Sequence, residues 1–146
     1  MEIEDDLISL KLPDATQEES IIKVIGVGGG GSNAVNHMFR QGIHGVEFVV
    51  CNTDIQALRQ SRVKNRIQLG KELTEGRGAG CQPERGRLSA IESMDFIKTI
   101  LEHNTRMVFI TAGMGGGTGT GAAPEIARQA KELGILTIGI VTVPFR

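Results

Sequence analysis

Glycine dominates residues 113–121, which read Gly-Met-Gly-Gly-Gly-Thr-Gly-Thr-Gly. An apolar run at 107–110 precedes this segment, and a helix-like run at 122–127 follows it. Backbone N–H groups at a strand-to-helix turn converge on phosphate, and glycine admits the anion because it has no Cβ. Thr118 and Thr120 add hydroxyl donors. The segment therefore indicates a phosphate-binding loop rather than a flexible linker, because linkers do not join a buried strand to an amphipathic helix.

A second glycine run follows an apolar segment near the amino terminus. It contains Gly26-x-Gly28-x-x-Gly31, which satisfies the dinucleotide fingerprint, and Asp54 falls in the window of a ribose-binding acid. An NAD-dependent oxidoreductase domain is therefore an alternative function, which binding of NADH would test. The richer glycine loop further along the chain and the lack of an evident catalytic His, Lys or Tyr constellation in the sequence argue against it.

Neither glycine run carries the lysine of a P-loop, because Ser32 follows Gly31 directly and 113–121 contains no lysine. Backbone N–H groups, helix N-termini and a cation must then offset the negative charge of the phosphates. We therefore expect any hydrolysis to depend on Mg²⁺. The polar cluster 52–54 follows another apolar run, as a phosphate or hydrated-metal site requires. Its aspartate also suits a helix N-cap, and the two roles are compatible.

The segment GGGTGTG at 115–121 resembles the signature of the FtsZ/tubulin family of GTPases, and its flanks are more similar to bacterial FtsZ sequences than to tubulin. The resemblance covers roughly residues 20–146 and includes four loops. It implies GTP or GDP as ligand with Mg²⁺, which Asp54 would contact through water rather than directly. The implied nucleotide-binding residues are Gly28, Gly29, Gly30, Gly31, Ser32, Asn33, Asn52, Thr53, Asp54, Gly78, Ala79, Gly80, Gly115, Gly116, Gly117, Thr118, Gly119 and Thr120.

Within those loops the resemblance implies separate roles. Residues 52–54 are expected at the sugar, the γ-phosphate or a metal-bound water, 78–80 at the γ-phosphate, and 117–119 at the α- and β-phosphates. The chain departs from the family at Ser32, where many members carry Gly or Ala, and at Cys81-Gln82, where Ala-Asn is usual.

The family resemblance also implies GTP-dependent assembly into head-to-tail protofilaments of a bacterial division ring, with hydrolysis completed between subunits. The segments expected to read guanine, to form the central helix, to supply catalytic acids and to bind other division proteins lie beyond this chain. We therefore expect no catalytic residue within it and little or no GTPase activity from it alone. A non-catalytic assembly domain is a further alternative.

Composition fits such a protein. The chain has 146 residues, of which 40% are hydrophobic and 23% charged, as in soluble globular domains. No segment is apolar for the length of a membrane span, and no signal peptide opens the chain, so we expect a cytoplasmic protein at the division septum without membrane insertion. Lys and Arg form no dense run and aromatic residues are few, which argues against nucleic acid as a partner.

Strand-like and helix-like segments alternate along the chain between these loops. The expected strands are 21–27, 46–51, 65–69, 106–111 and 135–143. The expected helices are 33–40, 55–60, 83–102 and one after the signature loop that runs to about 133, with Pro124 in its first turn. Such alternation predicts an α/β fold, a Rossmann-like parallel sheet with helices on both faces and the glycine-rich phosphate loops at its carboxyl edge.

Charge divides the chain into two parts. Residues 1–20 hold seven acids and one lysine, which gives −6, and we expect a disordered acidic extension there. Residues 21–146 carry a net charge of +5, which suits a polyphosphate ligand, and are expected to form the GTP-binding domain. Two cysteines, Cys51 and Cys81, are too few for a disulfide framework or a zinc site.

Overall fold

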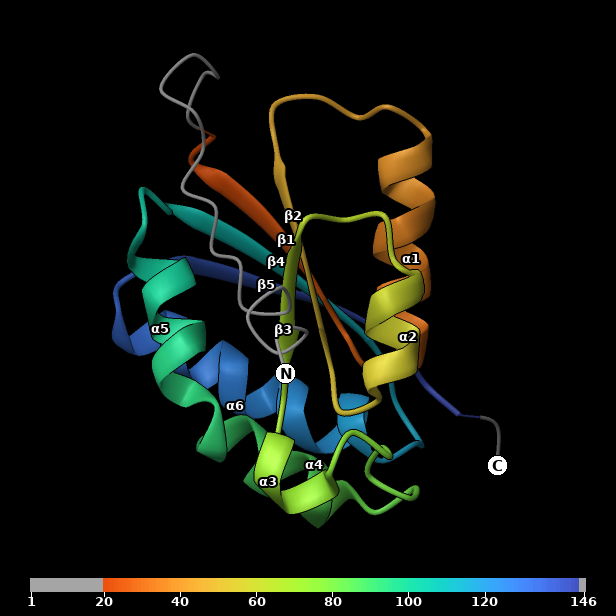
Figure 1. Cartoon of the computed structure of the whole chain (residues 1–146). Helices are drawn as coiled ribbons and strands as arrows, with labels where there is room; N and C mark the ends of the chain where they lie inside the picture. Colours follow the sequence, from red (N-terminus) through yellow and green to blue (C-terminus); the bar gives the residue numbers. More distant parts are fainter. Residues whose placement is uncertain (1–19, 145–146) are drawn as a thin grey trace, which may run out of the picture.

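A computed structural model describes residues 20–144 of the chain, so the acidic extension up to residue 19 lies outside the described residues. At its centre is a five-stranded parallel sheet in the order β3-β2-β1-β4-β5 (Figure 1). The strands are Ile22–Val27 (β1), Glu47–Asn52 (β2), Asn65–Gln68 (β3), Met107–Gly113 (β4) and Leu136–Thr142 (β5). The order reverses between β1 and β4, and ligands bind at the carboxyl end of such a switch point.

Helices cover both faces of this sheet, as Figure 1 shows. They are Gly28–Arg40 (α1), Ile55–Gln60 (α2), Lys71–Thr74 (α3), Pro83–Glu92 (α4), Met94–Glu102 (α5) and Thr118–Glu132 (α6). Helices α1 and α2 pack on one face, while α4, α5 and α6 pack on the other. The expected α/β class with a parallel sheet is confirmed. None of the helices within 20–144 has the length and hydropathy to span a bilayer.

Two hydrophobic clusters explain why β1 carries apolar side chains on both of its faces after Lys23. Val24 packs with Val35 and Leu58 on the α1 side of the sheet. Its neighbours Ile25 and Val27 belong to the larger cluster under α4, α5 and α6. Because successive strand residues point to opposite faces, a strand covered on both sides is apolar at most positions and not only at alternate ones.

Helix α1 begins at Gly28, so the expected loop over 28–32 and the helix start at Asn33 are wrong. Gly26 and Gly31 explain the difference. A Cβ on Gly26 would collide with the carbonyl oxygen of Gly31, and a Cβ on Gly31 would collide with that of Thr111. Glycine at both positions lets the helix lie directly against β1 and β4. Local helix propensity disfavours glycine, but this tertiary contact overrides it.

The structure also corrects two other helix predictions. The single helix expected over 83–102 is two helices, divided at Ser93. The Ser93 hydroxyl accepts a hydrogen bond from Gly70 N and donates to Gln68 O, which ties the break to the end of β3. Helix α6 begins at Thr118, so Pro124 lies inside the helix rather than in its first turn.

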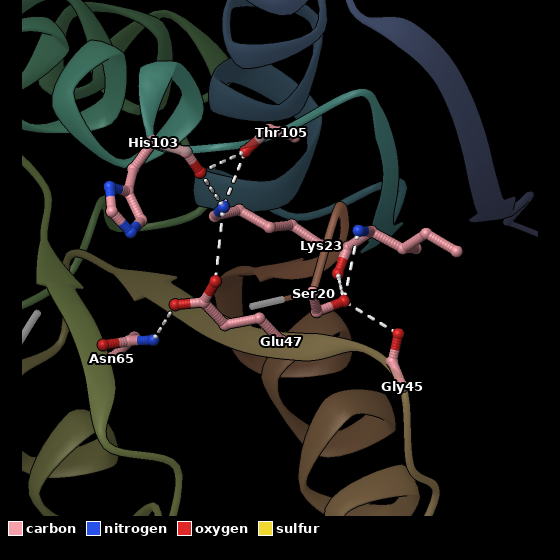
Figure 2. Close-up of polar contacts among 8 residues, drawn as sticks. Ser20, Lys23, Gly45, Glu47, Asn65, His103 and Thr105 are labelled. Atoms are coloured by element: carbon pink, nitrogen blue, oxygen red, sulfur yellow. Dashed lines mark hydrogen bonds and ion pairs between the residues drawn. The ribbon is translucent and has the colours of Figure 1, made fainter. Parts of the chain in front are cut away.

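The amino edge of the sheet contains a buried lysine network, drawn in Figure 2. The side chain of Lys23 on β1 is 1% exposed, and its Nζ donates to His103 O and Thr105 Oγ1, each at 2.6 Å. It also lies 3.2 Å from Oε2 of Glu47, whose other oxygen accepts from Asn65 Nδ2 at 2.9 Å. The network therefore joins β1, β2 and β3 to the turn between α5 and β4, at the edge opposite the glycine loops.

Candidate functional site

The carboxyl edge of the sheet brings together the four loops that the sequence analysis selected. The first opens α1 after β1, the second follows β2, the third lies between α3 and α4, and the signature loop joins β4 to α6. Contacts between them are direct, so residues as far apart in the chain as Gly28 and Gly119 lie at one place.

The amino termini of α1 and α6 meet at this edge. A Cβ on Gly28 would lie only 2.9 Å from the backbone nitrogen of Gly119. Neither N-cap residue, Val27 or Gly117, provides a side-chain cap, and neither helix has an acid in its first turn. Two sets of helix N–H groups and two positive dipole ends therefore lie side by side, and neither N-cap side chain accepts from them. This is the arrangement that binds a multiply charged anion.

The loop after β2 is joined to α6 through two buried hydroxyls. Thr53 Oγ1 and Thr118 Oγ1 lie 2.7 Å apart and form a hydrogen bond. Asn52 Oδ1 accepts from the backbone nitrogens of Thr53 and Asp54, at 2.8 and 3.3 Å, which holds the loop in shape. The carboxylate of Asp54 caps α2, as expected, and both capping bonds use its Oδ1.

The third loop rests on the signature loop. A Cβ on Gly117 would lie 2.9 Å from Gln82 N and 3.0 Å from Ala79 Cβ. An isolated β-bridge between Asp54 and Arg77 joins the same loop to the segment after β2. Gly78 and Gly80 adopt left-handed backbone angles, with φ of +88° and +60°, which side chains rarely tolerate. The four loops therefore form one continuous surface.

Two glycines of this surface are required neither by packing nor by the backbone. Gly29 and Gly116 have ordinary φ angles, and a Cβ on either would meet no atom within 4 Å. Gly29 is the second residue of α1, and Gly116 precedes the N-cap of α6. Because no contact among the described residues requires glycine at either position, the open space beside Gly29 and Gly116 points to a ligand that approaches the backbone.

The other predicted nucleotide-binding residues differ in burial and in the contacts that they make. The Thr120 hydroxyl accepts from Gly115 N at 2.9 Å, which holds the signature loop in shape. The Ser32 hydroxyl is buried and has no partner among the described residues. Asn33 is exposed on α1. Gly30 approaches Gly113, because a Cβ there would lie 3.4 Å from Gly113 Cα.

Two further helix glycines support the site: Gly86, which the sequence analysis did not single out, and Gly121, which it named only as the last residue of the signature loop. A Cβ on Gly86 of α4 would collide with Gly117 O, so this glycine lets α4 lie under the signature loop. A Cβ on Gly121 of α6 would collide with Pro83 O, so it permits close contact between α4 and α6. An isolated glycine inside a helical pattern is the sequence signal that indicates such packing.

The cysteines and acids near the four loops decide whether the site could use a thiol or bind a metal directly. Cys51 lies buried on β2, where burial raises the pKa of its thiol from 9.0 to about 12, and Cys81 is exposed in the third loop. Both are free. Within 20–144, no group of three or more His, Cys, Asp or Glu side chains is placed to hold a metal ion. Asp54 is the one acid among the predicted nucleotide-binding residues, and it already caps a helix.

Comparison with known proteins agrees with this geometry. The family described as Tubulin/FtsZ family, GTPase domain, matches residues 21–146. The cell division protein FtsZ of Aquifex aeolicus is 61% identical over 125 residues, which cover 86% of this chain and 34% of that protein.

Solved structures with the same fold include an FtsZ dimer from M. jannaschii, described as empty. It has a TM-score of 0.83 and 44% identity, and the match covers 89% of this chain and 38% of that one. A GDP-bound monomer of CetZ1 from Haloferax volcanii has a TM-score of 0.74 and 26% identity, over 84% and 41% of the two chains. The present chain thus spans about a third of the length of the curated relatives that it matches.

Proposed function

The chain belongs to the Tubulin/FtsZ family of GTPase domains, and from this we propose that it is the guanine-nucleotide-binding part of a cytoskeletal GTPase of cell division. The single observation that carries the proposal is the pair of glycines, Gly29 and Gly116, whose missing side chains leave space beside two uncapped helix termini. The proposal of an NAD-dependent oxidoreductase loses its support, because the dinucleotide fingerprint lies within a segment that this family match covers.

The phosphate chain of GTP or GDP is proposed to lie over the joined amino termini of α1 and α6. Backbone N–H groups there supply hydrogen bonds without a lysine. The hydrogen-bonded pair Thr53 and Thr118 keeps the wall of the site rigid, and the third loop closes it beside Gly117.

Mg²⁺ is proposed as the companion cation, because phosphate charge at this site faces no lysine in the four loops. Asp54 fits an indirect contact: Oδ1 is occupied by the capping bonds, and Oδ2 is left to accept from a metal-bound water. When bound, the cation would offset charge on the phosphates.

Self-assembly and division are proposed by analogy with relatives. Proteins named cell division protein FtsZ are similar to this chain, and one solved relative is a dimer. We propose that the full polypeptide forms head-to-tail filaments at the division septum, in the cytoplasm, and that hydrolysis needs acids from outside the four loops. The 146-residue chain alone should therefore bind nucleotide and hydrolyse it slowly or not at all.

The test is direct. The purified chain is denatured and filtered, and the supernatant is separated by anion-exchange chromatography with ultraviolet detection; protein that emerges empty is then titrated with GDP and GTP in Mg²⁺. Guanine nucleotide in the supernatant, or saturable binding of either one, supports the proposal.

The matched variants are Gly29→Leu and Gly139→Leu. Both glycines are open, with no atom within 4 Å of an added Cβ, but Gly139 lies on β5. We expect Gly29→Leu to abolish binding with an unchanged melting temperature and Gly139→Leu to leave binding intact. Binding by Gly29→Leu at the wild-type level, or no binding by the wild type, would contradict the proposed site.

A further inference from the structure

Acidic side chains are missing from most of one face of the domain. The sequence has no Asp or Glu in residues 20–46 and none in residues 55–70, the two stretches that contain α1 and α2. These helices pack on the same face of the sheet (Figure 1). Two acids lie between the stretches: Glu47 is paired with the buried Lys23, and Asp54 caps α2. The charge that remains on this face is therefore positive.

Four exposed bases gather at one end of this face, and together they form a basic patch: Arg40, Arg59, Arg62 and Lys64. Arg40 ends α1 and lies one turn after Asn36, whose Oδ1 accepts from Ser61 Oγ at 2.6 Å. Residues four apart share a helix face, so Arg40 lies beside the segment that carries Arg62. The sequence spaces these bases apart, and the packing of α1 against the end of α2 brings them together.

No acid of the described chain neutralises the basic patch. Within residues 20–144, none of its four side chains forms an ion pair. Arg40 and Arg59 stand in the last turns of their helices, where the helix dipole favours a positive charge. That explanation does not extend to Arg62 and Lys64, which follow the end of α2. A surface with one sign of charge attracts an anionic partner.

The same chain contains an anionic segment. Residues 1–19 hold seven acids and one lysine, which gives a net charge of −6, and four of the acids fall within residues 2–6. This acidic extension also contains leucine and isoleucine, while Phe39 and Ile43 are exposed beside Arg40. The extension and the basic patch are therefore complementary in charge, and both offer apolar side chains.

The start of the described chain lies within reach of the basic patch. Ser20 Oγ donates to Gly45 O at 2.7 Å, in the loop that follows α1 (Figure 2). Parallel strands begin at the same edge of a sheet, and two strand spacings, about 10 Å, separate β1 from β3, which Lys64 directly precedes. Thirteen residues separate Asp6 from Ser20, and an extended chain of that length spans about 45 Å. The acids can therefore reach the patch without any change in the described fold.

We propose that the acidic extension, residues 1–19, binds the basic patch of its own chain. The contact joins carboxylates to guanidinium and ammonium groups at the surface. A tethered segment meets its site at a high effective concentration, which favours the extension over an anion free in solution. The extension thereby shields a surface that would otherwise attract external polyanions. This inference goes beyond the proposed function and does not depend on nucleotide binding.

Zero-length cross-linking of the 146-residue chain tests the contact, because a carbodiimide joins a carboxylate to a lysine amine only where the two touch. Mass spectrometry of the digested monomer identifies the links. Lys64 reports on the basic patch, and Lys131, an exposed lysine of α6 on the opposite face of the sheet, is its matched control. At low salt we expect links from residues 2–6 to Lys64 and few to Lys131. The links to Lys64 should be lost at about 1 M salt, where the Debye length falls to about 3 Å.

Two variants change the charge without removing the reporter lysine. Arg59→Gln/Arg62→Gln should lower the yield of the Lys64 links about fourfold, because two surface ion contacts are lost and each changes an equilibrium by about twofold. Arg77→Gln/Arg128→Gln removes the same net charge from exposed arginines outside the patch and should leave the yield unchanged. Both variants should melt as the wild type does.

Three results would overturn the inference. Equal yields at Lys64 and Lys131 would show that the extension has no preference for the basic patch, which would then be left to an external anion. A yield at Lys64 that neither salt nor Arg59→Gln/Arg62→Gln lowers would show that charge does not hold the contact. Links to Lys64 found only in a cross-linked dimer would make a second copy the partner. All three leave the proposed function untouched, because none of them measures nucleotide binding.

Discussion

Replacing Glu47 with glutamine should destabilise the domain more than removing the buried lysine that it neutralises. Lys23 Nζ lies 3.2 Å from Glu47 Oε2, with the lysine side chain 1% and the glutamate side chain 25% exposed. Glu47→Gln preserves the shape of the side chain and its capacity to accept a hydrogen bond. It removes the charge that balances the ammonium group, and an unbalanced charge in the interior is costly.

The magnitude follows from the burial of the two partners. Breaking a buried ion pair from one side costs about 3–5 kcal/mol, and partial solvent access at Glu47 places this variant nearer to about 2–3 kcal/mol. Lys23→Met removes the buried charge itself. It leaves the Glu47–Asn65 bond intact, and Thr105 Oγ1 still donates to His103 O, so we expect a loss of about 1–2 kcal/mol.

The assay is urea unfolding followed by far-UV circular dichroism, because the chain has neither Trp nor Tyr for fluorescence. The free energy of unfolding is extrapolated to zero urea. If its slope against urea concentration is the same in variant and wild type, the area exposed on unfolding has not changed. Glu84→Gln is the control. It breaks the exposed Glu84–Arg87 pair on α4 and should change stability much less.

The double variant Lys23→Met/Glu47→Gln decides between explanations. If the cost arises from an unbalanced buried charge, the double variant will be more stable than Glu47→Gln alone. A double variant whose loss equals the sum of the two single losses would refute this account. So would a Glu47→Gln protein that unfolds at the wild-type urea concentration.

Four further predictions concern packing, the site and the two thiols. Gly121→Ala should lower stability by about 1–3 kcal/mol, since the new Cβ would lie 2.6 Å from Arg87 N and collide with Pro83 O; a melting temperature equal to the wild type would contradict this. Thr53→Val should lower the free energy of unfolding by about 1–3 kcal/mol, because it leaves the buried Thr118 hydroxyl without its partner. The double variant Thr53→Val/Thr118→Val should be little less stable than Thr53→Val alone. Thermal unfolding of the two single variants and the double variant measures both effects. Iodoacetamide at neutral pH should modify only the exposed Cys81, and Cys51 should react only after unfolding, as mass spectrometry would show. The pKa of the Cys51 thiol is raised from 9.0 to about 12 in the folded chain, so the thiol ionises first in the unfolded chain. The free energy of unfolding should therefore fall as pH rises above 9. A stability difference between wild type and Cys51→Ala that does not change with pH would contradict this prediction.

Local patterns predicted much of the fold. The alternation of apolar runs with helix-like runs indicated a parallel sheet, because strands covered on both faces form nearly continuous apolar runs. Asp54 was predicted as an N-cap from its position alone, and the structure confirms the cap. These features depend on neighbours within a few residues, which a sequence displays directly.

Helix boundaries were less predictable where glycine is abundant. The start of α1 at Gly28 and of α6 at Thr118 depends on contacts with distant backbone, not on propensity. The break at Ser93 depends likewise on the carbonyl of Gln68, on another element. Propensity is a weak prior that tertiary contacts override.

The sequence by itself determined the family of this protein, because the glycine loops and their spacing are local and specific. It did not show which glycines serve packing, as Gly31 and Gly121 do, and which leave open space, as Gly29 and Gly116 do. It did not show that Lys23 is buried, since this depends on partners such as Glu47 that the fold brings close. Only the tertiary structure decided these points, because the order of the strands sets which distant residues become neighbours.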